Sequence, residues 1–315
     1  MIEVSRLERR LAVHPPGAAS RRRQRATRAL TPYALLLPAA FLYAVFIIYP
    51  IYRQFEISFY DWHIFPGASN PFVGFANYSR FFNDPEIRTA AINTLLFTVI
   101  TVPVQMVLGL MAAALLTDRL PGRGLLRGLI FIPVVTSWVV VSYIFAYIFA
   151  DQGGLANAVL SFFEGHTVRI DWLAQTWTGN AVIWLVSIWK GIGWSFIMFL
   201  AALDGVPRTL VESGRVDGAS ERRVWRHVVL PAIRPTIVFV SVLLVIGASQ
   251  VFTQVYLLTG GGPYGSTHVL LSNAYQQAFT FFQFSYAAAI ASVMAVVVLM
   301  LSILQIRVLR RGDAA

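Results

Sequence analysis

Residues 204–235 read DGVPRTLVESGRVDGASERRVWRHVVLPAIRP, a polar interval between two long apolar stretches. Pro207 suits the first turn of a helix, because the N–H that proline lacks would have no helical partner there. Helix-compatible residues continue through Arg215, and Asp217-Gly218 is then a turn signal. The first half of the interval therefore predicts a short helix followed by a tight turn.

The second half of the interval predicts another helix. Ser220 is a good N-cap for a helix that runs through Val229. Pro231 and Pro235 then break or kink the chain just before the next apolar stretch. The interval is thus expected to form a helix–turn–helix on the surface of the protein. Its mixed charges suit docking onto a soluble partner (Arg208, Glu212, Arg215, Asp217, Glu221 and Arg222).

The chain as a whole is too apolar for a soluble protein. Of its 315 residues 57% are hydrophobic and 13% charged, against about 45–50% and 25% in a soluble domain. A bilayer core needs roughly 20 apolar residues per helix. Six stretches meet that length, so we predict an all-α, polytopic membrane protein with six transmembrane helices: Leu30–Tyr52, Thr89–Leu116, Leu125–Phe149, Asn180–Leu203, Thr236–Leu258 and Phe284–Ile306.

The positions of the basic residues predict the orientation. With both termini inside, 20 of the 25 Lys and Arg residues lie in or beside cytoplasmic segments, as positively charged loops do. The net charge of +10 is therefore interpreted as topogenic, and no nucleic-acid partner is expected. We divide the chain into a basic cytoplasmic tail over 1–29, which contacts membrane lipids, and a six-helix membrane domain over 30–315 that contains the loop 204–235.

Several chemistries are excluded by the residues. The chain has no cysteine, and its only lysine, Lys190, lies inside a predicted span, so no Walker-type nucleotide loop exists. The five histidines are scattered, and we expect no metal site, no bound cofactor and no catalytic residue. No acidic residue lies within the six spans, which counts against a proton- or sodium-coupled carrier. A self-contained secondary carrier or channel for a small polar solute stays open as the alternative.

At the loop 204–235 the chain resembles a known family. Glu212, Gly218 six residues later, and Leu230-Pro231 reproduce the EAA loop of binding-protein-dependent ABC importer permeases. The stretch Arg215–Ser220, with Asp217, Gly218 and Ala219, is similar to the sugar-importer version. The pattern departs where the family has two alanines, since Ser213 and Gly214 stand there, and Gly214 lowers helix stability by about 1 kcal/mol relative to alanine.

The resemblance extends over nearly the whole chain after residue 30. The stretches 72–78, 93–94, 153–157 and 259–267 are similar to maltose- and glycerol-phosphate-type carbohydrate permeases. It implies a type I ABC importer in the bacterial cytoplasmic (inner) membrane. The expected partners are a second, distinct permease subunit, an ABC ATPase dimer that holds ATP and Mg, and an extracytoplasmic solute-binding protein. The loop residues Glu212, Ser213, Gly214, Asp217, Gly218, Ala219, Leu230 and Pro231 would then couple the chain to the ATPase, as a helix seated in a cleft.

Polar residues inside the spans suggest a path for the cargo, which we expect to be a di- or oligosaccharide or a glycerol-phosphate-like polyol. Trp184, Ser187, Lys190 and Trp194 follow helical spacing in the fourth span. Asn93 in the second span and Gln250, Thr253 and Gln254 in the fifth complete the candidate set. Two other readings stay open: the amides could bond neighbouring helices, and Lys190 could make an ion pair or a contact with backbone carbonyls.

Overall fold

The computed structural model describes residues 33, 35–65, 67, 69–117 and 121–310. The chain forms two units, Met1–Glu56 and Ile57–Ala315. The predicted tail 1–29 and the predicted start of the first span at Leu30 lie outside the described residues.

The described part of the first unit is one long apolar helix, whose last residue, Ile57, belongs to the second unit. It runs over Leu35–Ile57 and includes a π-helical turn, η1 (Ala44–Ile48), and the segment α3 (Tyr49–Ile57). Arg53 and Glu56 form an ion pair of 2.6 Å near its end. With a mean hydropathy of 2.0 over its most apolar part, the helix is long and apolar enough to cross a membrane.

The second unit is helical, and its described part contains no strand, only an isolated bridge between Tyr60 and Phe72. Three helices in it are long enough to cross a membrane: α5 (Pro85–Thr117), α9 (Thr176–Asp204) and α16 (Phe284–Arg310). Two bent pairs would each make a further span, so that the described part of the chain has four to six candidate spans. The pairs are α6 (Arg123–Val135) with α7 (Trp138–Ile148), and α11 (Glu221–Val224), η2 (Trp225–Val229) and α12 (Leu230–Ala232) with α13 (Arg234–Ser249).

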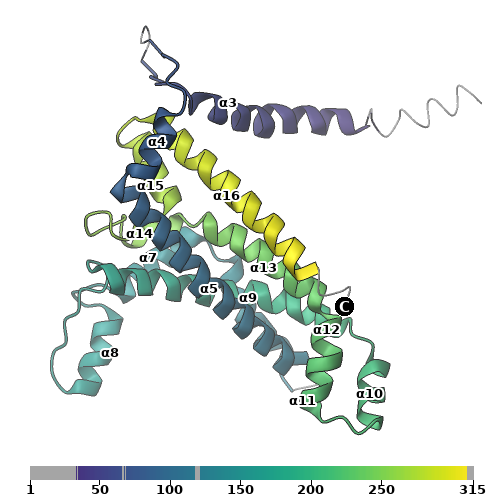
Figure 1. Cartoon of the computed structure of the whole chain (residues 1–315). Coiled ribbons are helices and arrows are strands. Elements are labelled where there is room, and N and C mark those ends of the chain that lie inside the picture. The colour runs from purple at the N-terminus through teal and green to yellow at the C-terminus, as the bar shows by residue number, and fades with distance from the viewer. Residues whose placement is uncertain (1–32, 34, 66, 68, 118–120, 311–315) are drawn as a thin grey trace, which may run out of the picture. The chain divides into compact units, whose positions relative to one another are not determined.

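Short helices occupy the segments between the spans. Where the sequence predicted only loops, the structure has α4 (Ala76–Asn83), α8 (Leu155–Glu164) and α15 (Leu270–Phe279). The predicted helix–turn–helix is present as α10 (Arg208–Val216) followed by α11, η2 and α12. Figure 1 shows α10–α12 at one end of α5, while α4 and α15 lie at its other end.

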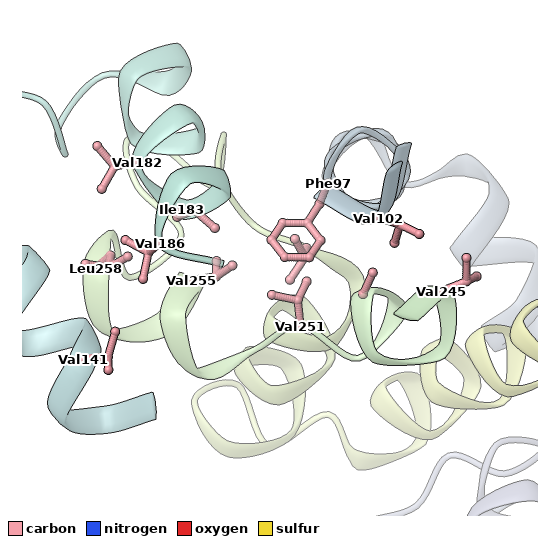
Figure 2. Packing of buried hydrophobic residues seen from close by; sticks show 12 residues of the cluster. Phe97, Val102, Val141, Val182, Ile183, Val186, Val245, Val251, Val255 and Leu258 are labelled. Carbon is pink, nitrogen blue, oxygen red and sulfur yellow. The ribbon is translucent and has the colours of Figure 1, made fainter. Parts of the chain in front are cut away.

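Helices α5 and α9 pack side by side along the centre of the unit (Figure 1). Their close approach depends on Gly109, where an added Cβ would lie 2.6 Å from Cβ of Ser195. Small residues at such contacts let membrane helices approach closely. Around this pair lies a core in which the Phe97 ring of α5 points toward Val251 and Val255 (Figure 2).

Two predicted spans are not continuous helices. The stretch Leu125–Phe149 was expected to be one helix, but α6 and α7 meet at a bend of 97°. The stretch Thr236–Leu258 is likewise interrupted: α13 ends at Ser249, and α14 (Thr253–Leu258) begins after a short break. Both breaks border the same cavity.

Candidate functional site

A cavity of about 330 Å³ opens between α5, α9, α13 and the start of α7. This volume lies at the lower end of the range for small-molecule sites. Amide, hydroxyl and indole groups share the wall with aliphatic and aromatic side chains, and no Asp, Glu, Lys, Arg or His lines it. The lining residues are Phe97, Thr101, Val102, Gln105, Trp138, Ser187, Gly191, Trp194, Leu243, Leu244, Gly247, Ala248, Gln250, Val251, Phe252, Thr253 and Gln254.

The first break brings α7 to the cavity. Pro133 lies inside α6, whose C-cap Thr136 has extended backbone dihedrals. Ser137 then caps α7, since its side chain accepts a hydrogen bond from the N–H of Val139. Trp138, the first residue of α7, lines the cavity as a result.

The second break is formed by residues 250–252. Gln250 is the C-cap of α13, and Phe252, with φ −146° and ψ −62°, precedes α14. All three residues of the break line the cavity. Non-helical backbone at membrane depth is tolerated where it lines a cavity or is buried in protein, so the location of the break agrees with the cavity.

Hydrogen bonds fix three of the polar side chains of the wall, those of Gln105, Ser187 and Gln254. Gln105 of α5 donates to the carbonyl of Ser187 at 3.0 Å, and Gln254 of α14 donates to its hydroxyl at 3.2 Å. A Cβ at Gly191 would overlap the Gln105 amide, so the glycine leaves room for it. Three helices thus present their amides and hydroxyls at one place.

Lys190 lies behind this wall and not on it. Its ammonium donates to the carbonyls of Pro133, Val134 and Thr136 at 2.5, 3.2 and 2.7 Å, and it lies 5.0 Å from the centre of the Trp138 ring. These carbonyls belong to the last turn of α6 and its cap, where no helical N–H can reach them. The positive charge also matches the negative end of the helix dipole. Lys190, which is 6% exposed, therefore caps the C-terminal end of α6.

The turn between α10 and α11 depends on Gly218. Its φ of +77° is in the left-handed region, which favours glycine. The Gly218 N–H donates to the carbonyl of Arg215, and the Ala219 N–H donates to that of Gly214, both at 3.0 Å. These two bonds form a Schellman motif, which satisfies the last carbonyls of α10.

The remaining residues of the turn have distinct positions. Asp217 is the C-cap of α10. Ser220 is the N-cap residue of α11, as predicted, and its carbonyl rather than its side chain accepts from the following N–H groups. Arg215 and Glu221 pair across the turn at 2.7 and 3.1 Å. Both side chains are more than half exposed, so the pair adds little stability.

The loop helices are packed onto the ends of α5 and α9. Val224, Val229 and Ile233 are buried in one cluster with Leu116 of α5 and Leu203 of α9. Beside this cluster lies a hollow of about 470 Å³ with a charged wall, formed by Asp204, Arg208, Glu212, Arg215 and Glu221. On α10, Leu210 and Val216 are 50% and 86% exposed. The loop therefore combines a rigid attachment with exposed apolar and charged groups.

Residues 105–311 match the family described as binding-protein-dependent transport system inner membrane component. The chain belongs to this family. A relative in Bacillus subtilis, 31% identical over 90% of this chain, is named a probable ABC transporter permease protein.

Individual relatives agree with the family of this permease. It is 34% identical to the lactose transport system permease protein LacF of Rhizobium radiobacter, over 87% of this chain and 92% of the relative. It is 32% identical to the arabinooligosaccharides transport system permease protein AraP of Bacillus subtilis, over 94% and 95% of the two chains. In fold it matches a chain in the crystal structure of a bacterial ABC transporter involved in the import of the acidic polysaccharide alginate. That match has a TM-score of 0.78 and 23% identity over 92% and 99% of the two chains.

The permease places the predicted pathway residues in two groups. Ser187, Trp194, Gln250, Thr253 and Gln254 all line the cavity. Lys190, Trp184 and Asn93 do not belong to its lining.

The residues outside the lining contact other parts of the permease. Trp184 packs against the core around Phe97. Asn93 donates to the carbonyls of Ser266 and His268 at 2.7 and 2.9 Å, and thereby ties α5 to the segment before α15.

Sequence reasoning missed Trp138 and Thr101 on the cavity wall. Trp138 follows Pro133 and Ser137, which together signal the end of one helix and the start of another. Thr101 is 1% exposed and donates to the carbonyl of Phe97 at 2.7 Å, so its hydroxyl is already engaged. Across the described residues, no group of three or more His, Asp or Glu side chains could hold a metal ion.

Proposed function

We propose that this permease subunit moves a carbohydrate, a di- or oligosaccharide or a related polyol, into the cell through an importer driven by ATP. The observation that carries the proposal is the cavity, where amides, hydroxyls and two indole rings meet without an ionisable side chain. Hydroxyl-rich solutes bind to such amides, and aromatic faces pack against sugar rings. The names of the lactose and arabinooligosaccharide relatives support the same cargo class. A neutral sugar fits this wall better than a glycerol phosphate, whose charge would find no cation there.

Within this function, Ser187, Trp194, Gln250, Thr253 and Gln254 contact the cargo. The three remaining members of the predicted set act indirectly. Lys190 holds the end of α6, Trp184 supports the core behind the cavity, and Asn93 holds the segment before α15.

The chain crosses the bacterial cytoplasmic membrane six times, with both termini in the cytoplasm. Four single helices, the bent pair α6–α7, and α13 together with α14 supply the six spans, which leaves α10–α12 for the loop. The distribution of Lys and Arg supports the orientation, because 20 of the 25 lie in or beside the segments that this topology places in the cytoplasm.

The loop α10–α12 docks onto an ABC ATPase dimer, which binds ATP and Mg on its own residues. Exposed Leu210 and Val216 offer an apolar contact, and the charged hollow beside them holds Glu212. Gly218 fixes the angle between α10 and α11, while Leu230 and Pro231 connect the loop to α13. Ser213, Gly214, Asp217 and Ala219 complete the docking segment.

The complete importer contains a second permease, distinct from this one, and an extracytoplasmic solute-binding protein. The test is to purify the tagged chain gently from its native membrane and identify what accompanies it by mass spectrometry. An ABC-type ATPase and a second multi-span protein are expected. The purified assembly in proteoliposomes should then take up the sugar bound by its solute-binding protein only when ATP is supplied on the cytoplasmic side.

The second candidate is a carrier that works alone. It is favoured if the chain purifies without an ATPase and if a proton or sodium gradient drives uptake in proteoliposomes without nucleotide. Uptake driven by a gradient alone would overturn the importer proposal. The charge-free wall of the cavity argues against this candidate, since a coupling ion needs a carboxylate or a set of carbonyls to bind.

A further inference from the structure

Helix α8 has an outer face made only of apolar residues. Every exposed side chain from Leu155 to Phe163 is apolar. Phe162 and Phe163 are 82% and 79% exposed, and Leu155 and Val159 are 57% and 46% exposed. These positions lie on one side of a helix with 3.6 residues per turn. At ten residues α8 is too short to cross a bilayer, so this face needs another environment.

The inner face of α8 is fixed, so the helix cannot turn its apolar face inward. Asn157 is 5% exposed and donates to the carbonyl of Ile170 at 2.9 Å, while its own side-chain oxygen accepts from the indole N–H of Trp172 at 2.9 Å. One turn further on, the hydroxyl of Ser161 accepts from the N–H of Val168 at 2.9 Å. The apolar face is therefore a permanent feature of the surface of this chain.

Its anchors place α8 at the level where two membrane helices end. The ring of Trp172 packs edge-on against Phe149, the C-cap of α7, with ring centres 5.7 Å apart. Tyr147 near the end of α7 and Trp177 at the start of α9 are 71% and 69% exposed. Exposed tyrosine and tryptophan at the ends of membrane helices are typical of the headgroup region.

We propose that α8 lies in the interface of the bilayer, with Leu155, Val159, Phe162 and Phe163 inserted among the phospholipid acyl chains. An interfacial helix buries its apolar face at the boundary between headgroups and chains. A docking face for a protein that binds and leaves would be about as polar as the rest of the surface, whereas this face has no polar side chain before Glu164. That the leaflet is the outer one rests on the topology proposed above.

The test uses the absence of cysteine in the chain, which makes every introduced cysteine unique within it. Single variants Val159→Cys, Phe162→Cys and Phe163→Cys receive a nitroxide spin label, with Gln152→Cys and Thr167→Cys as controls at exposed polar positions outside α8. The labelled chain, with the subunits that co-purify with it, is placed in nanodiscs of phosphatidylethanolamine and phosphatidylglycerol. Collision rates with oxygen, which concentrates in lipid, and with a neutral nickel complex, which stays in water, are measured for each label.

At the three α8 positions we expect the label to collide more often with oxygen than with the nickel complex. At the two control positions we expect more collisions with the nickel complex. A label at Phe162 that collides more with the nickel complex faces water, and that result overturns the proposal. A label shielded from both reagents is covered by protein, which overturns it equally. Labelling of Gln152→Cys in intact cells by a membrane-impermeant maleimide tests the leaflet separately, so an error in topology is distinguishable from an error about lipid contact.

Discussion

Replacement of Lys190 by methionine tests whether the broken helix α6–α7 depends on a single side chain. Methionine keeps most of the length of lysine and removes only the ammonium group. The carbonyls of Pro133, Val134 and Thr136 would lose their charged donor in a site that is 6% exposed at Lys190. We expect the variant to be less stable, because these acceptors face the end of α6 and have no helical donors.

The size of the effect can be estimated from these contacts. Each buried acceptor left without a partner costs about 1–3 kcal/mol. The Pro133 carbonyl keeps a bond from the hydroxyl of Thr136 at 2.6 Å, and the bond to Val134 is long at 3.2 Å. The loss is therefore closer to two full bonds than to three. Since the variant also avoids the burial of a charge, we expect a net loss of about 2–5 kcal/mol in the free energy of unfolding.

The assay heats the purified transporter in mild detergent and measures, by size-exclusion chromatography, the fraction that stays folded at each temperature. The readout is the unfolding temperature. Arg169→Met is the matched control, because it removes an exposed charge and should leave the unfolding temperature unchanged. Lys190→Arg keeps the charge and should recover part of the loss. The KM for the cargo should rise in Lys190→Met only as far as Trp138 is displaced from the wall, because Lys190 itself does not line the cavity. A variant as stable as the native protein would refute the capping role, and a raised KM at native stability would favour a direct contact with cargo.

Three further predictions concern the loop and the segment before α15. Gly218→Ala should lower the free energy of unfolding by about 1–2 kcal/mol, because a residue with a Cβ is strained at a φ of +77°. The variant should also lower the ATP-driven uptake rate, and Gly218→Asn should lower it less. Uptake at the native rate by the alanine variant would contradict this prediction. Gly214→Ala should stabilise α10 by up to about 1 kcal/mol and so raise the unfolding temperature. The new Cβ would lie 3.4 Å from a methyl group of Val224, which is an ordinary contact. A lower unfolding temperature would show that α10 has no room for the alanine side chain. Burial lowers the pKa of His268 more than the charge of Glu86 raises it. The stability that neutral His268 contributes should therefore be complete above the pKa of histidine in the unfolded chain, about 6.5, and should decline as the pH falls toward the lower pKa in the folded protein. Unfolding temperatures measured from neutral to mildly acidic pH should therefore fall less steeply in His268→Gln, and an equal slope would exclude this histidine as a source.

The long helices could be predicted from the sequence because hydropathy decides them. The stretch Thr89–Leu116 lies within α5, and Asn180–Leu203 lies within α9. The breaks could not be predicted by the same means, since a hydropathy window averages over them. Proline alone does not mark a break either: Pro103 lies inside an intact α5, whereas Pro133 comes just before the bend. The two prolines differ in a tertiary contact, because Lys190 of α9 donates to the carbonyls at the break after Pro133.

The candidate site shows the same limit. Helical spacing in the fourth span grouped Ser187, Lys190 and Trp194 on one face, and the first and last of them line the cavity. Lys190 departs from that group because its long side chain reaches α6, which approaches α9 closely at Gly193, where a Cβ would overlap the carbonyl of Ile130. Trp138 belongs to no polar stripe, and only the bend of α6–α7 brings it to the wall.

The attachment of the loop to α5 and α9 has a mechanical consequence. The cluster that holds the loop includes Leu203, and the cavity wall includes Trp194 on the same continuous helix, roughly 13 Å away at 1.5 Å per residue. Helix α5 repeats this arrangement with Leu116 and Gln105. The loop attachment and the cavity wall thus lie on the same two helices, α5 and α9, with no helix break between them. In the proposed importer, a movement of the docked loop would therefore tilt the cavity wall as well, without a relay of intermediate side chains.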